Sequence, residues 1–242
     1  MREQILAYAI KYQGEYGKIK KAIENSEKYE RISYRGEYIT ILDEEYPRVF
    51  FELDEPPFIL FYKGDLSLLD IEGIGVVGSR NCSQYGIDMC KVIVSKSRSS
   101  CIISGLAKGI DAHAHRFALE AYKNTIAIIG CGLDVIYPKE NADLYEALSS
   151  QLILSEYPRN VAPLAVHFPR RNRLIAALSS KLVVVEASER SGTLLSVNEA
   201  LALNRDVYVV PYHYGETSGK GCNYLILQGA NILYNEEDIC EL

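Results

Sequence analysis

Tryptophan is absent from this chain of 242 residues, methionine occurs twice, and no apolar run reaches about 18 residues. The last absence argues against a membrane-spanning helix. The first 12 residues contain Arg2, Glu3 and Lys11, so they lack the apolar core of a signal peptide. The six cysteines form no Cys-x-x-Cys pair, which argues against a disulfide scaffold. We therefore expect a cytoplasmic protein with free, mostly buried thiols and no membrane partner.

The histidine spacing and the net charge of the chain indicate neither a metal site nor a general affinity for polyanions. His113 and His115 stand two residues apart, so on one helix they point to different faces and predict no metal site. The net charge is −6, which argues against indiscriminate binding to polyanions. Residues 76–180, however, hold 12 Lys and Arg against 8 Asp and Glu, and both flanking segments are acidic. A focused basic surface in the middle of the chain is therefore compatible with the composition.

Short apolar runs alternate with helical patterns from about residue 74 onward. Such runs, separated by helices, indicate parallel strands buried on both faces. The expected strands are 58–62, 74–77, 101–104, 125–129, 152–156, 182–186, 207–210 and 231–233. The expected helices are 84–96, 109–122, 142–149, 172–178, 194–203 and 223–228. The pattern predicts an α/β fold with a doubly wound, mostly parallel sheet, an extended Rossmann-like domain.

Two helical patterns at residues 3–12 and 16–24 precede this domain, with Gly14 between them. We predict a reduced helical N-terminal module over residues 1–42 and the Rossmann-like domain over residues 43–242.

Polar and glycine residues follow the strands where an open α/β sheet binds its ligands, outside the carboxyl ends. The first parallel strand is followed by Gly78, Ser79 and Arg80, and the next by Gly105 and Lys108. The strand at 182–186 leads to Ser191, Gly192 and Thr193. Glycines allow close backbone approach and helix N-termini favour anions, so this edge suits phosphate groups.

The strongest local signal is the segment Phe168 to Arg173, in which three arginines occupy four positions at the start of a helix. Guanidinium groups grip phosphates, and an adjacent aromatic ring can stack on a base. On a helix Arg170 and Arg173 share a face. We expect this pair, with Phe168 and Asn172, to line a groove, and Arg171 to point outward or toward an acid.

Nucleotide cofactors are disfavoured. Gly73, Gly75 and Gly78 spell G-x-G-x-x-G, but the strand lies inside the motif rather than before it, and no acidic residue follows at the spacing that a ribose would need. Asp111 is interpreted as a helix cap or an anchor for Lys108. Neither Asp134 nor Glu140 suggests an acid–base pair, since both sit in a turn-rich loop.

Taken in order along the chain, these motifs resemble the DprA/Smf (DNA processing protein A) family. The resemblance covers roughly residues 46–233 and rests on Gly78-Ser79-Arg80, the run from Ser104 to His115, Gly132-Leu133-Asp134, Tyr137 to Asn141, Ser155 to Pro158, Phe168 to Arg173, Val185-Glu186-Ala187, Ser191-Gly192-Thr193 and Gly221-Cys222-Asn223. It implies a non-enzymatic, homodimeric protein that binds single-stranded DNA without a cofactor. It also implies delivery of RecA recombinase onto incoming strands in natural transformation.

The resemblance assigns DNA contacts residue by residue. These are Gly78, Ser79, Arg80, Gly105, Lys108, Phe168, Arg170, Arg171, Asn172, Arg173, Ser191, Gly192 and Thr193. One departure is Tyr212, which stands where the family usually has a glycine after Val-Pro, and it leaves the conformation of this loop open.

Two alternatives share the fold, a phosphoribohydrolase-like enzyme and a nucleotide-sensing module. The enzymes carry Gly-Gly-x-Gly-Thr-x-x-Glu. In this chain the third residue after Thr193 is Ser196, and Glu199 comes about one helical turn too late. Without that glutamate we expect no catalytic acid or base.

Overall fold

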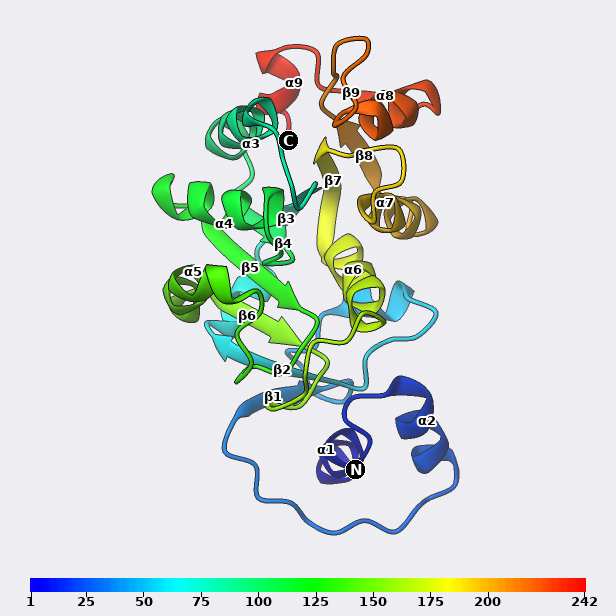
Figure 1. The fold of residues 1–242 in the computed structure, drawn as a ribbon. Helices are drawn as coiled ribbons and strands as arrows, with labels where there is room; N and C mark the ends of the chain where they lie inside the picture. Colours follow the sequence, from blue (N-terminus) through cyan, green and yellow to red (C-terminus); the bar gives the residue numbers. More distant parts are fainter.

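The computed structural model describes all residues, 1–242, and its centre is one nine-stranded sheet in the order β1-β2-β6-β5-β4-β3-β7-β8-β9 (Figure 1). The strands are β1 (Glu37–Thr40), β2 (Ile59–Gly64), β3 (Gly73–Gly78), β4 (Cys101–Ser104), β5 (Asn124–Ile129), β6 (Leu152–Ser155), β7 (Ser179–Glu186), β8 (Asp206–Val209) and β9 (Asn231–Ile232). From β6 to β9 all pairings are parallel, whereas β1 and β2 join antiparallel. The predicted doubly wound, mostly parallel sheet is confirmed.

Helices cover both faces of the sheet. They are α1 (Arg2–Lys11), α2 (Tyr16–Glu24), α3 (Gln84–Lys96), α4 (Ile110–Glu120), α5 (Ala142–Ala147), α6 (His167–Leu178), α7 (Thr193–Ala202), α8 (Lys220–Leu227) and α9 (Glu236–Cys240). Figure 1 shows α3, α4 and α5 on one side of the sheet and α6 and α7 on the other. None of these helices combines the length and the apolarity that crossing a bilayer requires.

The inner strands are buried because their side chains are apolar on both faces. The runs at 74–77, 101–103 and 182–185 are fully buried and join the main hydrophobic core. A strand that is apolar on both faces is stable where helices cover both faces of the sheet, as the sequence predicted.

The chain leaves β3 in one direction, through β4, β5 and β6, and then returns through β7 to the other side of β3. The switch point therefore lies between the carboxyl ends of β3 and β7. Ligand sites of open α/β sheets form at such a point, because the loops on its two sides turn away in opposite directions.

The N-terminal helices pack on the antiparallel edge of the sheet. Ile5, Tyr8 and Ile19 form a small core with Ile59 and Phe61 of β2. Strand β1, which falls inside the predicted module 1–42, pairs with β2, so the sheet begins before residue 42. The division of the chain into two domains stays a prediction.

Candidate nucleic-acid interface

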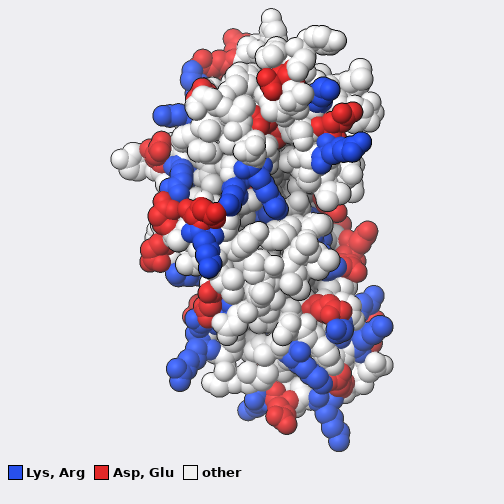
Figure 2. Space-filling view, viewed as in Figure 1, with Lys and Arg blue, Asp and Glu red and all other residues white.

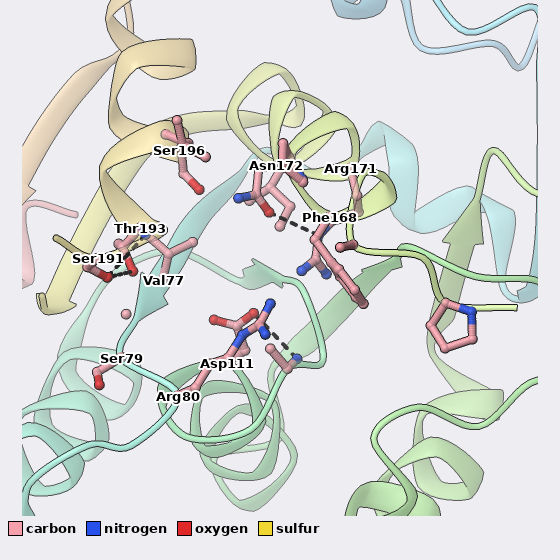
Figure 3. Close-up of a pocket in the computed structure, with 18 of the residues that line it drawn as sticks. Val77, Ser79, Arg80, Asp111, Phe168, Arg171, Asn172, Ser191, Thr193 and Ser196 are labelled. Atoms are coloured by element: carbon pink, nitrogen blue, oxygen red, sulfur yellow. Dashed lines mark hydrogen bonds between the residues drawn. The ribbon is translucent and has the colours of Figure 1, made fainter. Parts of the chain in front are cut away.

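A pocket of about 810 Å³ opens at the switch point. Three parts of the chain make up most of its lining: the loop after β3 with Asp111 of α4, the start of α7, and the N-terminal half of α6. Ala107, Tyr137, Pro163 and Ala165 complete it. Figure 3 shows these three groups facing one another across the cavity. The structure therefore brings together most of the residues that the sequence predicted at this edge, including Gly78, Ser79, Phe168, Asn172, Ser191, Gly192 and Thr193.

Arg80 supplies the most accessible positive charge in the pocket. Its side chain is exposed and has no carboxylate within salt-bridge distance. The guanidinium carbon lies 5.2 Å from the centre of the Phe168 ring, and the Tyr137 ring lies 5.6 Å from the same ring. Arg80, Phe168 and Tyr137 thus form a platform, at once cationic and aromatic, on the pocket wall. Figure 2 shows Lys and Arg side chains gathered beside a hollow near the middle of this face.

Lys108 lies next to the pocket rather than in it. It lines a smaller cavity of about 170 Å³ that shares Arg80, Phe168 and Arg171 with the main pocket. Its ammonium nitrogen lies 2.5 Å from Glu140, and both side chains are exposed. An exposed pair of this kind contributes at most about 1 kcal/mol, so an incoming phosphate can replace Glu140.

Arg171 forms part of the buried floor of the pocket. Its guanidinium donates to the carbonyl oxygens of Gly105 and Ile128, and its Nε donates to Asn172 Oδ1 at 3.1 Å. A Cβ on Gly105 would overlap the guanidinium, so glycine is needed there. The prediction that Arg171 points outward is wrong, because the side of α6 that carries it faces the pocket and the sheet; the alternative, an acid nearby, is met by Asp111.

Arg170 and Arg173 share a face of α6 as expected, but that face turns away from the switch-point pocket. Arg170 pairs with Glu55 at 2.8 Å. Arg173 donates to Glu156 and to the backbone oxygen of Glu55, and the ion pair with Glu156 is more than nine-tenths buried. The prediction that both line the pocket groove with Phe168 is wrong. The spacing of Phe168, Arg171, Asn172 and Ile175 is the signal that identifies the pocket face.

Asp111 is the only acidic residue that lines the main pocket. Its Oδ2 accepts a hydrogen bond from the Ala107 amide at 3.4 Å, so it holds the loop after β4 and does not anchor Lys108. Burial raises the pKa of this carboxyl, and the guanidinium groups of Arg171 and Arg80 oppose that rise.

The start of α7 adds hydroxyl and amide groups to the pocket. Ser191 Oγ accepts from the Thr193 amide at 3.2 Å and lies 2.9 Å from the Thr193 hydroxyl. Gly192 is exposed, and a side chain there would meet open space. The N-terminal amides of α7 therefore stand beside the pocket, where a helix favours anions.

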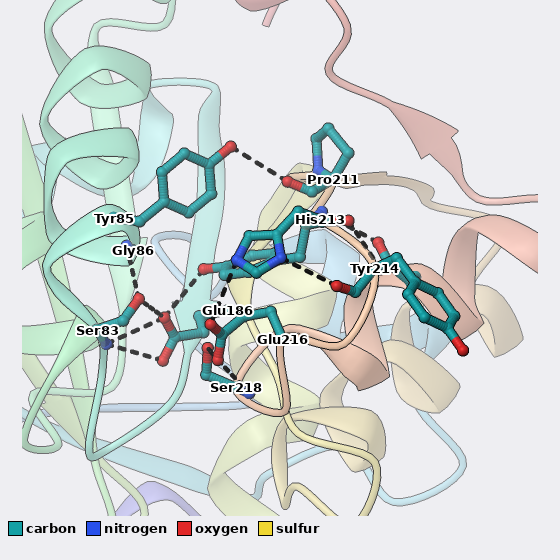
Figure 4. Close-up of polar contacts among 11 residues, drawn as sticks. Ser83, Tyr85, Gly86, Glu186, Pro211, His213, Tyr214, Glu216 and Ser218 are labelled. Carbon is teal, nitrogen blue, oxygen red and sulfur yellow. Dashed lines mark hydrogen bonds and ion pairs between the residues drawn. The ribbon is translucent and has the colours of Figure 1, made fainter.

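A second polar cluster is centred on Glu186, at the end of β7 (Figure 4). Its carboxylate is fully buried and accepts hydrogen bonds from the amide and hydroxyl of Ser83, which caps α3. Tyr212 donates to the same carboxylate at 3.0 Å. The open question at the loop after β8 is thus answered: the Tyr212 ring is buried, edge-on against Tyr85 at 5.0 Å. Sequence reasoning missed Glu186 as an anchor, since its partners come from α3 and from the loop after β8.

The histidines and cysteines assemble no metal site. No group of three or more His, Cys, Asp or Glu residues could hold an ion, and the six cysteines are unpaired. His115 is fully buried, with Nδ1 at 2.6 Å from Thr125 Oγ1. Because the Thr125 hydroxyl donates to Ile102 O at 2.8 Å, Nδ1 must carry the proton. Nε2 has no partner, and burial lowers the pKa of this imidazole to about 3.

Comparison with known proteins identifies the family of this chain. The family described as DNA recombination-mediator protein A matches residues 37–242. The DNA processing protein DprA of Streptococcus pneumoniae is 44% identical over 202 residues, which cover 83% of this chain and 72% of that protein. Two Smf proteins are matched over only about half of their length, 53% for Synechocystis and 54% for Escherichia coli.

Two solved structures share the fold over most of the chain. The X-ray structure of DprA from S. pneumoniae has a TM-score of 0.83 and 35% identity, covering 99% of this chain and 92% of that one. A structure of DNA processing protein A from Helicobacter pylori, described by its single-stranded DNA binding mode, has a TM-score of 0.75 and 31% identity. It covers 84% of this chain and 94% of that one.

Proposed function

We propose that this chain, which belongs to the DNA recombination-mediator protein A family, binds single-stranded DNA in the switch-point pocket and catalyses no reaction. The observation that carries the proposal is the exposed, unpaired guanidinium of Arg80 lying over the Phe168 ring. Single strands are held by cations that follow the backbone and by rings on which bases stack. Arg80 and Phe168 offer both within one contact.

The rest of the pocket fits the same ligand. Arg80, Lys108 and the N-terminal amides of α7 would hold phosphates, while Phe168 and Tyr137 would stack on bases. Arg171 is already engaged by two backbone carbonyls, so its role would be to keep the pocket floor positively charged. The single-stranded DNA binding described for the H. pylori relative supports this ligand class.

The absence of catalysis is proposed on the composition of the pocket. General acid–base chemistry on a glycosidic bond uses two carboxyl groups, and Asp111 is the only one in the lining. Ser196, at the position of the glutamate in phosphoribohydrolase-like enzymes, also lines the pocket. Incubation with nucleoside monophosphates should therefore release no free base, and release by the purified protein would favour the enzymatic alternative.

We also propose a homodimer and a cytoplasmic location. The last strand, β9, pairs on one side only, and the exposed side chains of Leu227, Ile232 and Tyr234 lie at or next to this edge. Edges of this kind pair with a second copy unless they are covered. Light scattering at several concentrations tests the dimer. Delivery of RecA recombinase, the partner that the family implies, predicts faster RecA assembly on single strands when this protein is present.

Binding is tested by fluorescence anisotropy with a labelled 20-nucleotide strand across a salt series. If Arg80 and Lys108 each neutralise one phosphate, these two contacts should contribute a slope of about −1.4 to the plot of log K against log[salt]. Duplex DNA and mononucleotides should compete poorly. A slope near zero would contradict the phosphate contacts.

A further inference from the structure

A second cavity, of about 530 Å³, lies on the other side of α6 from the switch-point pocket. The turn between α1 and α2 lines it from one side, and Tyr157, the loop before α6 and the first turn of α6 line it from the other. None of the residues assigned to the switch-point pocket by sequence reasoning lies here except Arg170.

The two cavities share one wall, and its residues alternate between them. In the loop before α6, Pro163 and Ala165 line the switch-point pocket, whereas Leu164 and Val166 line the second cavity. The same division continues in the first turns of α6, where Phe168 and Arg171 face one cavity and His167 and Arg170 the other. The segment ends in a turn that leads into α6, in which the His167 amide donates to Leu164 O, so a single short segment separates the two sites.

The second cavity contains the same combination of groups as the first. The Arg170 guanidinium lies 5.6 Å from the centre of the Tyr16 ring, and the rings of Tyr157 and His167 stack at 3.9 Å. Lys11, the last residue of α1, and Lys18, in the first turn of α2, add two ammonium groups. Aromatic rings interleaved with cations are what a single strand requires.

The cations of the second cavity are available to phosphates. Arg170 pairs with Glu55 at 2.8 Å and Lys18 with Glu15 at 2.7 Å, and in each pair at least one side chain is well exposed. Such pairs are weak and give way to a stronger anion. Arg170 Nη2 is also buried without a hydrogen-bond partner, so this guanidinium has donor capacity left.

We propose that the second cavity is a further subsite for the same DNA strand, which passes over the wall at residues 163–166. Leu164 and Val166 are 53% and 67% exposed on that wall and would contact the sugars and bases as the strand crosses. Four residues span at most about 14 Å even when fully extended, and a few nucleotides cover that distance. A short strand would then fill one pocket only, and a longer strand both.

This inference rests on the proposed function, and its test separates the two. The affinities of a 5-nucleotide and a 15-nucleotide strand are measured for the wild type, Lys18→Glu, Lys20→Glu and Arg80→Ala. Lys20 is the matched control, because it is an exposed lysine of α2 that does not line the cavity.

Lys18→Glu should weaken binding of the 15-nucleotide strand about tenfold and leave the 5-nucleotide strand unchanged, and Lys20→Glu should change neither. The salt slope for the long strand should also become shallower by about 0.7 with Lys18→Glu, the value for one lost phosphate contact. Arg80→Ala should weaken both strands.

Equal affinities of Lys18→Glu and Lys20→Glu for the long strand would overturn the second subsite while leaving the first intact. If the wild type binds neither strand, the proposed function itself fails. Tyr16→Ala provides an independent variant, in which the loss of a base contact should again weaken only the long strand, by about tenfold. Because Tyr16 also stacks on Phe58 at 4.9 Å, its free energy of unfolding is measured as well, and the unchanged affinity for the short strand shows that the first pocket is intact. Tyr122→Ala, a tyrosine that is 99% exposed and lines neither cavity, is its control.

Discussion

Replacing Arg80 with alanine should separate DNA binding from stability. The side chain is exposed and its recorded contact is the ring of Phe168, so its loss should change the free energy of unfolding by about 1 kcal/mol or less. A charge-assisted hydrogen bond to a phosphate contributes about 1.5–3 kcal/mol. Affinity for single-stranded DNA should therefore fall by roughly 10- to 150-fold, and the salt slope should become shallower by about 0.7.

Arg173→Ala should have the opposite profile. Arg173 forms a buried ion pair with Glu156, and removing one partner of such a pair typically costs about 3–5 kcal/mol of stability. Burial raises the pKa of Glu156, so the abandoned carboxyl can take up a proton and reduce this cost. Because Arg173 lines neither cavity, the salt slope of the folded variant should equal that of the wild type.

Both variants are measured by anisotropy across a salt series and by urea denaturation of the same preparations. The assignment of the pocket face of α6 would be refuted if Arg173→Ala changed the salt slope. The assignment of Arg80 to a phosphate contact would be refuted if Arg80→Ala lost stability and kept its affinity.

Three further predictions test individual side chains. Phe168→Ala should weaken DNA binding by about 1–3 kcal/mol in the anisotropy assay, through the loss of one stacked base. Tyr212→Phe should lower the free energy of unfolding in urea by about 1–2 kcal/mol, because the buried carboxylate of Glu186 loses a donor. The pKa of His115 is about 3 in the folded chain and about 6.5 when unfolded, so its contribution to stability is complete above pH 6.5 and is lost as pH falls toward 3. Urea denaturation at pH 7.5 and pH 5 should show a loss of about 2 kcal/mol from this group, and His115→Gln should lack it.

The sheet could be predicted from the sequence because its inner strands are continuous apolar runs, which are stable only when both faces of the strand are buried. Strand β1 was missed because Glu37–Thr40 is short and only Ile39 and Thr40 in it are buried, so no alternation marks it and its pairing with β2 is a tertiary effect. Helix α9 was also missed, although its capping box between Asn235 and Asp238 is a local signal. The family resemblance inferred from the motifs is confirmed.

The location of the candidate site could be predicted from the sequence, but the side chains of α6 that face it could not. Strand ends and glycines place Gly78, Ser79 and Ser191 at one edge without knowledge of side-chain packing. The rotation of α6 about its axis depends on which of its side chains pack on the sheet. That choice puts Arg171 under the pocket and Arg173 against Glu156. Because all three residues are arginines, their charge alone cannot predict which of these roles each one has.

The buried carboxylate of Glu186 has a consequence for small molecules in the cell. In dinucleotide-binding folds the helix after the first parallel strand receives the pyrophosphate at its N-terminus. In this chain the corresponding helix, α3, already has an anion there, because Glu186 accepts from the Ser83 amide and a Cβ on Gly86 would clash with it. The pyrophosphate of ATP or NAD would have to displace the Glu186 side chain from the Ser83 amide before it could bind there. The start of α3 is therefore occupied by a side chain of the protein itself, and the switch-point pocket is the anion site left at this edge of the sheet.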